Sequence, residues 1–248
     1  MKSMLTRRTV RSYSEEPVGE LMLNELLETA FRSSNTGNMQ AYSVVVTRDP
    51  EMKKMLAPLH FNQSQILEAP VVLTFCADFN RFSKWCEQRN AVPGFDNIQS
   101  FTYSSIDAVI LTQTFCVAAE EKGLGLCYLG TTTYNADKIA KLLKLPKLVM
   151  PLTTISLGYP KEKSEEPLSD RLPLSGVVHY ETYKDYTPAD IDKIFELKES
   201  CPENLKFVEI NKKENLAQVF TDLRYTKKDN EFFSDEFVTA LREQGFIK

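Results

Sequence analysis

Residues 7–17 read RRTVRSYSEEP, in a chain of 248 residues whose formal net charge is −4. Arg7, Arg8 and Arg11 place three guanidinium groups near the amino terminus, and their spacing of three and four residues would make them converge on one helical turn. Arginine binds phosphate through bidentate hydrogen bonds, and Thr9 adds a hydroxyl donor. The stretch therefore predicts an anion site. The alternative interpretation is a solvated basic segment.

The same stretch resembles the opening motif of the FMN-dependent nitroreductase family, in which it holds the flavin phosphate and ribityl chain. Further segments resemble that family in the family's own order, and two of them are similar to its larger branch, the NADPH-dependent, oxygen-insensitive nitroreductases and flavin reductases. These segments span nearly the whole chain: SNTGNMQ at 34–40, CADFNR at 76–81, GLGLCYLG at 123–130, KLLKLP at 141–146 and DRLP at 170–173.

The resemblance implies an α+β fold of three layers, α/β/α, around a mixed central sheet. It also implies an interlocked homodimer with flavin at the subunit interface. Residues 1–200 would form the FMN-binding core. Residues 201–248 would form a C-terminal extension of the same domain, with a mobile basic loop and a terminal helix.

The pattern of apolar residues supports layered packing without reference to any family. Apolar side chains at helical spacing predict an amphipathic helix over residues 18–31. Two runs rich in β-branched residues and two further short apolar runs predict strands. Helical patterns separate the four, so helices should cover both sheet faces. The predicted strands are residues 42–47, 71–76, 124–129 and 152–157.

Residues 104–121 are apolar nearly all round, which is typical of a helix buried on every side. Such a helix lies either at the protein's centre or in a subunit interface, and the resemblance implies a homodimer.

The C-terminal third is less regular. Residues 161–170 form a charged stretch that predicts a loop, and Thr187 followed by Pro188 predicts a capped helix start. Residues 201–233 lack clean periodicity and are predicted to be the most mobile segment, with a terminal helix beginning at Ser234.

Composition and missing motifs disfavour several classes of protein. The acidic charge balance, without a long basic block, argues against nucleic acid as a partner. No apolar run has the length of a membrane span or signal peptide, so we expect a cytoplasmic protein. Phosphate-loop, nucleophile-elbow and complete Rossmann motifs are missing. Gly123, Gly125 and Gly130 can be explained as ending a helix and permitting tight turns.

The histidines and cysteines give no sign of a metal centre or a disulfide scaffold. His60 and His179 stand far apart without carboxylates at ligand spacing, so we predict no metal. The odd number of cysteines, without a C-x-x-C pair, suits reduced thiols. They are Cys76, Cys86, Cys116, Cys127 and Cys201.

The resemblance implies a set of FMN-binding residues and no catalytic residue in the usual sense, because flavin N5 carries the chemistry. For two of its segments the alternatives stay open: a helix-ending loop at 34–38, with Gly37 in a left-handed conformation, and a surface glutamine at Gln63. Ser169 replaces a lysine usual in the larger branch, and Arg7 replaces a frequent histidine. The predicted set is Arg7, Arg8, Thr9, Arg11, Asn35, Thr36, Gly37, Gln63, Tyr128, Leu129, Gly130, Thr131 and Arg171.

The predicted function is that of an FMN-dependent NAD(P)H oxidoreductase that reduces nitroaromatics or quinones by ping-pong hydride transfer, with NADPH or NADH as co-substrate. The alternatives are a flavin, azo or metal-oxyanion reductase on the same fold, and a non-catalytic flavin-binding protein. Arg224, Lys227 and Lys228 form the densest basic cluster after residue 200 and are predicted to contact the NADPH 2′-phosphate. The alternative interpretation of that cluster is a solvated loop.

Overall fold

The structure is a computed structural model that describes residues 2–162 and 168–248. It divides into two compact units, one formed by Met1–Glu165 with Phe233–Lys248 and the other by Glu166–Phe232. These points of division differ from the expected boundary after residue 200. That boundary was drawn between an FMN-binding core and an extension, and it stays a prediction. Part of the predicted loop at 161–170 lies outside the described residues.

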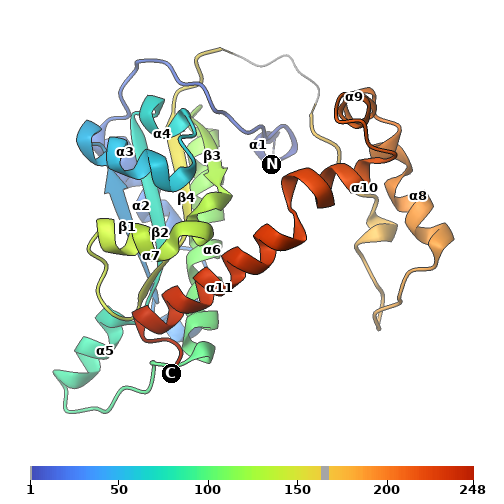
Figure 1. Cartoon of the computed structure of the whole chain (residues 1–248). Helices are drawn as coiled ribbons and strands as arrows, with labels where there is room; N and C mark the ends of the chain where they lie inside the picture. Colours follow the sequence, from blue (N-terminus) through green and yellow to red (C-terminus); the bar gives the residue numbers. More distant parts are fainter. Residues whose placement is uncertain (1, 163–167) are drawn as a thin grey trace. The chain divides into compact units, whose positions relative to one another are not determined.

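The larger unit is built on a four-stranded sheet in the order β1-β2-β4-β3 (Figure 1). The three-layer α+β fold is confirmed. Every pairing between described strands is antiparallel, whereas a mixed sheet was expected. The apolar pattern of a strand sets which face each side chain takes but not the strand's direction. The strands are β1 (Tyr42–Thr47), β2 (Val71–Asp78), β3 (Gly125–Leu129) and β4 (Val149–Gly158).

Strand β4 begins at Val149, three residues before the predicted start, and so includes Pro151. Proline lacks an N–H and normally interrupts a ladder of hydrogen bonds. Here Pro151 lies opposite Cys76, where the register of β2 shifts between Phe75 and Cys76. The bulge at this point accommodates the proline within the strand.

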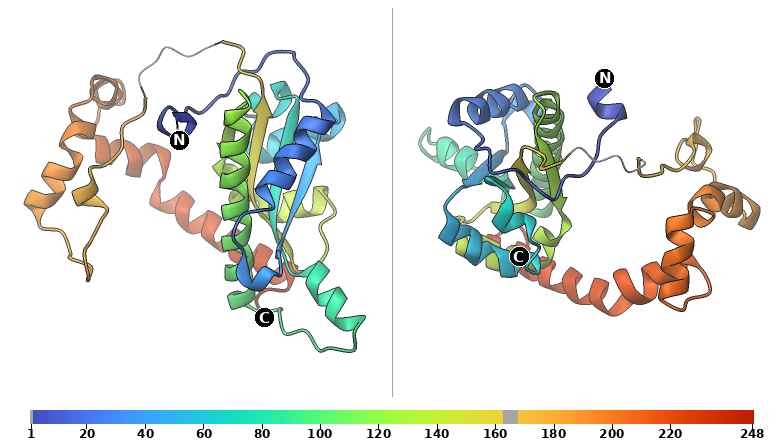
Figure 2. Two further views of the ribbon diagram at one scale, coloured as in Figure 1. Left: turned by 180° about the vertical axis from the view of Figure 1, so that it is seen from behind. Right: turned by 90° about the horizontal axis from the view of Figure 1, so that it is seen from above.

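Helices cover both faces of the sheet, as Figure 1 and the reverse view in Figure 2 show. On one face Leu26 and Phe115 pack against Leu73 and Phe75. On the other face Leu56 and Ile66 join the cluster around strand residue Val72. The first face carries α2 (Glu20–Ala30) and α6 (Ile98–Glu121); the second carries α3 (Pro50–Leu56), α4 (Gln65–Glu68) and α7 (Ala136–Leu142).

Helix α6 is not buried on every side within one chain, so that prediction is wrong for the single subunit. Its sheet-facing residues, such as Leu111 and Phe115, are fully buried, but its opposite face leaves large apolar side chains exposed. The all-apolar pattern therefore marks a helix with one face in the core and one apolar face uncovered in the chain. The exposed residues are Ile98, Tyr103, Ile106, Val109 and Ile110.

The amino-terminal segment, here called the arm (residues 6–14), is extended, so the expected helical turn at the arginines is wrong. Only α1 (Lys2–Leu5) is helical before it. The arm runs beside β3, where the Val10 N–H donates to the Leu126 carbonyl at 3.0 Å. A Cβ on Gly125 would lie 2.5 Å from Val10, so this close approach needs glycine. Pairing with the edge of β3 has overridden local helical spacing.

The smaller unit is more helical than its sequence suggests. The capped helix start at Thr187 is confirmed, because Thr187 and Asp190 form a complete capping box. The predicted irregular segment contains helices, and the last helix begins at Lys227, seven residues before Ser234. The elements are α8 (Pro188–Glu199), α9 (Pro202–Ile210), α10 (Leu216–Val219), a π-helical turn (Phe220–Arg224) and α11 (Lys227–Gln244), which continues into the larger unit.

The remaining elements are short and connect those above. They are α5 (Asn80–Glu87) and 3-10 turns at Thr36–Asn38, Ala57–His60, Gly130–Asn135 and Leu174–Gly176. The described helices include none long and apolar enough to cross a membrane.

Candidate functional site

The arm places three arginines beside strand β3. Arg11 is exposed and its side chain lies next to Cys127, whereas Arg7 and Arg8 are half-buried. Arg7 points toward α6, where its Nε lies 3.2 Å from Glu120 Oε1. A hollow of about 170 Å³ is bordered by Arg7, Arg8 and Glu120 together with Thr6, Val10, Leu124, Gly125 and Pro160.

Polar side chains beyond the end of β3 form a chain of hydrogen bonds. Gln65 Nε2 donates to Gln63 Oε1 at 2.8 Å, and Gln63 Nε2 donates to Thr131 Oγ1 at 3.5 Å. Thr131 Oγ1 lies 2.8 Å from His60 Nδ1. The Thr131 hydroxyl therefore bridges Gln63 and His60, since its oxygen can accept from Gln63 while it shares a hydrogen bond with the imidazole ring. Gln63 and Thr131, two predicted flavin contacts, are thus fixed relative to each other.

His60 is fully buried, and its Nε2 has no hydrogen-bond partner among the described residues. Burial lowers the pKa of His60 to about 4, because the charged imidazolium loses its hydration. The ordinary structural histidine that the sequence suggested therefore also holds Thr131. The described residues contain no group of three His, Cys, Asp or Glu side chains able to hold a metal ion.

This burial predicts loss of stability in mild acid. His60 binds a proton near pH 6.5 in the unfolded chain but only near pH 4 in the folded chain. The folded state therefore has its full stability above pH 6.5 and loses stability as the pH falls toward 4, because protonation of His60 favours the unfolded chain. We expect the free energy of unfolding to fall by about 2 kcal/mol between pH 7.5 and pH 5 through His60 alone. Urea unfolding of wild type and His60→Gln at both pH values measures this, and equal pH dependence in the two would contradict it.

The end of β3 combines buried side chains with an open backbone. Leu129 is buried in the core and Tyr128 Oη donates to Gln113 Oε1 at 3.1 Å. Burial raises the pKa values of Tyr128 and of Cys127, so neither is ionised near neutral pH. Gly130 has nothing within 4 Å of the position a Cβ would take. The backbone is therefore open at the position where the family resemblance implies contact with flavin.

The second predicted flavin-binding segment, at residues 35–37, contacts α6 far from Glu120. The Thr36 N–H and Oγ1 both donate to Asp107 Oδ1, at 2.8 and 2.9 Å, and Gly37 takes the predicted left-handed conformation at φ +56°. Asn35 Oδ1 accepts from the Gln40 N–H at 3.2 Å. Asp107 precedes Glu120 by thirteen positions on the helix, which corresponds to about 20 Å at the α-helical rise. One chain therefore holds the two sets of predicted flavin contacts well apart.

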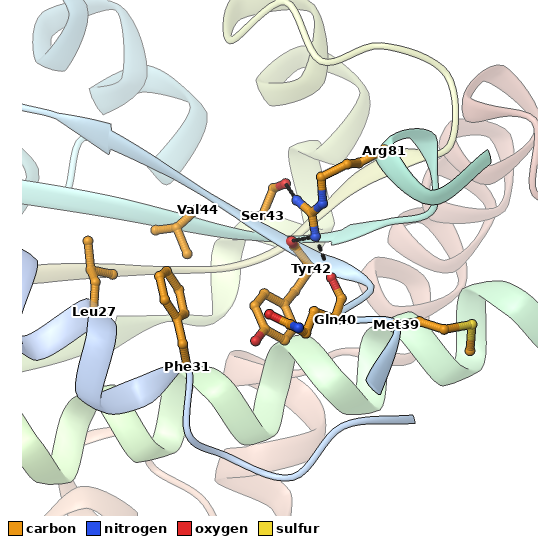
Figure 3. A pocket seen from close by; sticks show the side chains of 8 residues that line it. All are labelled: Leu27, Phe31, Met39, Gln40, Tyr42, Ser43, Val44 and Arg81. Atoms are coloured by element: carbon orange, nitrogen blue, oxygen red, sulfur yellow. Dashed lines mark hydrogen bonds between the residues drawn. The ribbon is translucent and has the colours of Figure 1, made fainter. Parts of the chain in front are cut away.

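A hollow of about 400 Å³ borders β1, and Figure 3 shows the eight side chains that line it. At one side Arg81 donates to the carbonyls of Gln40 and Tyr42 and to Ser43 Oγ. Ser43 Oγ in turn donates to Asp78, so this network fastens the turn before β1 to the end of β2. The predicted site residues do not line this hollow. One predicted segment, residues 35–37, does lie next to the hollow, because Asn35 accepts a hydrogen bond from Gln40, which lines it.

The predicted site residues of the smaller unit have local partners. Arg171 Nη1 donates to the Ser169 and Asp170 carbonyls at 3.2 and 2.7 Å. The Arg224 guanidinium stacks on Phe207 and Phe220, with 4.7 and 5.5 Å to the ring centroids. Lys227 and Lys228 lie exposed in the first turn of α11, so they belong to a helix where a loop was expected.

The donors beside β3 have the chemistry that FMN requires. Guanidinium groups and a threonine hydroxyl suit a phosphate, and glutamine and threonine side chains suit the ribityl hydroxyls and the polar edge of the ring. The backbone at Gly130 is open to an approaching ligand, because nothing lies within 4 Å of the position that a Cβ would take there. These residues therefore fit a flavin mononucleotide.

Comparison with known proteins gives consistent matches. The family model described as "Nitroreductase family" matches residues 4–159. The chain is 35% identical over 185 residues to the FMN reductase [NAD(P)H] of Bacillus subtilis, a match covering 74% of each protein. It is 32% identical over 177 residues to the oxygen-insensitive NADPH nitroreductase of Salmonella typhimurium, covering 71% of each. A crystal structure from Bacteroides fragilis superposes with a TM-score of 0.97, at 55% identity over 100% of both chains.

Proposed function

The chain belongs to the nitroreductase family, and we propose that it is an FMN-dependent NAD(P)H oxidoreductase that reduces nitroaromatics or quinones. FMN, when bound, would supply the redox chemistry that links the reduced nicotinamide to the acceptor. The observation that carries the proposal is the arginine arm, which lies along β3 and places Arg11 next to Cys127. The Cys127 sulfur also contacts Gln65, the hydrogen-bond partner of Gln63.

Each part of this site has a separate role. Arg8, Thr9 and Arg11 bind the phosphate, and Gln63 with the backbone at Gly130 and Thr131 orients the ring. Asn35, Thr36 and Gly37 supply polar contacts from the second segment. Side chains that donate hydrogen bonds suffice here, because the protein need not itself exchange a proton or electron pair with the substrate.

We further propose that the active form is a homodimer. The exposed apolar face of α6 needs a cover, because an uncovered stripe of five large side chains is unusual in a monomer. In a two-fold dimer the same face of each subunit packs against its copy. The 35–37 loop of one subunit can then complete the site beside the arm of the other, which removes the separation of about 20 Å within one chain.

The direct test is the visible spectrum of the purified protein before and after addition of NADPH or NADH under anaerobic conditions. We expect a flavin absorbance that is bleached by the nicotinamide and restored by a nitroaromatic or quinone. Protein that binds no FMN after reconstitution would overturn the proposal. Protein that keeps its yellow colour with both nicotinamides would be a flavin-binding protein without this activity.

Free flavin is the second candidate acceptor, because the B. subtilis relative at 35% identity is an FMN reductase. Comparing kcat/KM for free FMN, a nitroaromatic, a quinone, an azo dye and chromate at fixed NADPH would rank the acceptors. A preference for free FMN by more than about tenfold would make the protein a flavin reductase.

The nicotinamide preference can be tested at the basic turn of α11. Arg224 stacks on two phenylalanines, so its removal would also disturb packing, whereas Lys227 and Lys228 are exposed. We expect Lys227→Ala with Lys228→Ala to raise the KM for NADPH about tenfold and to leave the NADH reaction and bound FMN unchanged, as loss of uniform binding does. An unchanged ratio of the two KM values would show that the lysines are only surface residues.

A further inference from the structure

Arg7 and Glu120 form an ion pair in which the buried carboxylate lacks hydrogen bonds. The Glu120 side chain is 10% exposed and that of Arg7 is 23% exposed. Neither carboxylate oxygen has a hydrogen-bond partner among the described residues, so the 3.2 Å contact with Arg7 is an ion pair without hydrogen-bond alignment. Burial raises the pKa of Glu120, and Arg7 opposes that shift. Glu120 also lies in the last turn of α6, where the helix dipole disfavours negative charge.

The position of this carboxylate matters because it borders the small hollow shared with Arg8. An unpaired negative charge there would repel a phosphate bound by Arg8 and Arg11, since like charges close together in a partly buried site interact strongly. Arg7 is the cation that contacts Glu120 directly, so it neutralises the charge that the anion site would otherwise face.

The pair also fixes the arm at one end. Arg7 is held to α6 by Glu120, and Val10 is held to β3 by the hydrogen bond to Leu126. Arg8 and Thr9 are the two residues between these anchors. Their placement therefore depends on both contacts.

We propose that Arg7 is a positioning residue rather than a phosphate ligand, and that it acts by neutralising Glu120 and anchoring the arm that presents Arg8 and Thr9. This role rests on the proposed FMN function. It gives the first arginine of the motif a different task from the direct flavin contact predicted from the sequence.

The test is a double-mutant cycle on apoprotein titrated with FMN, with flavin fluorescence as the readout. Arg7→Met leaves Glu120 buried and unpaired, so the Kd for FMN should rise about tenfold. Arg7→Met with Glu120→Met replaces the pair by two apolar side chains of similar volume, which is often nearly neutral. The double variant should bind FMN within about threefold of wild type.

Arg8 provides the matched control. Arg8→Met should weaken FMN binding, and adding Glu120→Met should not restore it, because Arg8 acts on the phosphate directly. Failure of the Arg7 double variant to recover, or wild-type FMN binding by Arg7→Met alone, would overturn the positioning role. If Arg7→Met does not fold, the double variant decides alone. A folded double variant that binds FMN with near wild-type affinity supports the proposal, and a folded double variant that binds FMN weakly overturns it.

Thermal unfolding of the same apoproteins separates this proposal from the proposed function. The melting temperature should fall in Arg7→Met and recover in the double variant, independently of any flavin. Wild-type protein that binds no FMN would overturn the proposed function. Recovery of the melting temperature would then still support anchoring of the arm by the pair, and its absence would overturn it.

Discussion

Replacing Arg8 or Arg11 with alanine is expected to weaken FMN binding by about 1.5–3 kcal/mol, the usual contribution of a hydrogen bond to a charged group. Both residues belong to the arm, which is held along β3 by Val10 and along the end of β4 by Ser12 and Ser14. The loss should therefore come from the missing guanidinium and not from displacement of the backbone. Fluorescence titration of apoprotein with FMN measures it.

Two other arginines serve as controls for this prediction. Arg89→Ala removes an exposed guanidinium in the turn after α5 and should leave FMN affinity unchanged. Arg7→His should be mild, because histidine can still approach Glu120. Full flavin occupancy in both the Arg8 and Arg11 variants would contradict the assignment of the arm as the phosphate site.

Placing two glutamates on the exposed face of α6, Ile106→Glu with Val109→Glu, is expected to convert the proposed homodimer into monomers. These side chains are 51% and 53% exposed in the single chain, so a folded monomer can tolerate charge there. In a two-fold interface four carboxylates would be buried without partners, at a cost of several kcal/mol each. Analytical ultracentrifugation would show the change in mass.

The same double variant should also lose FMN, because the 35–37 loop of the partner would no longer reach the arm. Val92→Glu, at a position 97% exposed in the loop after α5, is the control and should remain dimeric. A dimer that survives both glutamates would contradict the proposed interface. A monomer with unchanged FMN affinity would keep the interface but contradict the shared site.

The sequence predicts those features whose causes are local. The run at Tyr42–Thr47 forms a strand with the predicted bounds, because β-branched residues fit a pleated strand. The capping box at Thr187 and Asp190 involves residues three positions apart and is visible in the sequence. Gly37 adopts the left-handed conformation expected in a loop that ends a helix.

The features that the sequence does not predict depend on partners far away in the chain. Arg7 meets Glu120 across more than a hundred residues, and His60 meets Thr131 across 71. No local spacing signals such pairs, so Glu120 and His60 were not singled out as site residues. The arm is extended for the same reason, since the edge of β3 that it follows lies beyond residue 124.

Contacts between the arm and the end of β4 set an order of events during synthesis on the ribosome. Tyr13 bridges to Pro160, and the Lys161 N–H donates to the Ser12 carbonyl at 3.1 Å. The arm is made before these partners and can form the contacts only after about 150 further residues have been added, which takes roughly 8–30 s at ordinary rates of translation. The arm is therefore among the last parts of the larger unit to reach its place, and a newly made chain can present the proposed flavin site only once the sheet is complete.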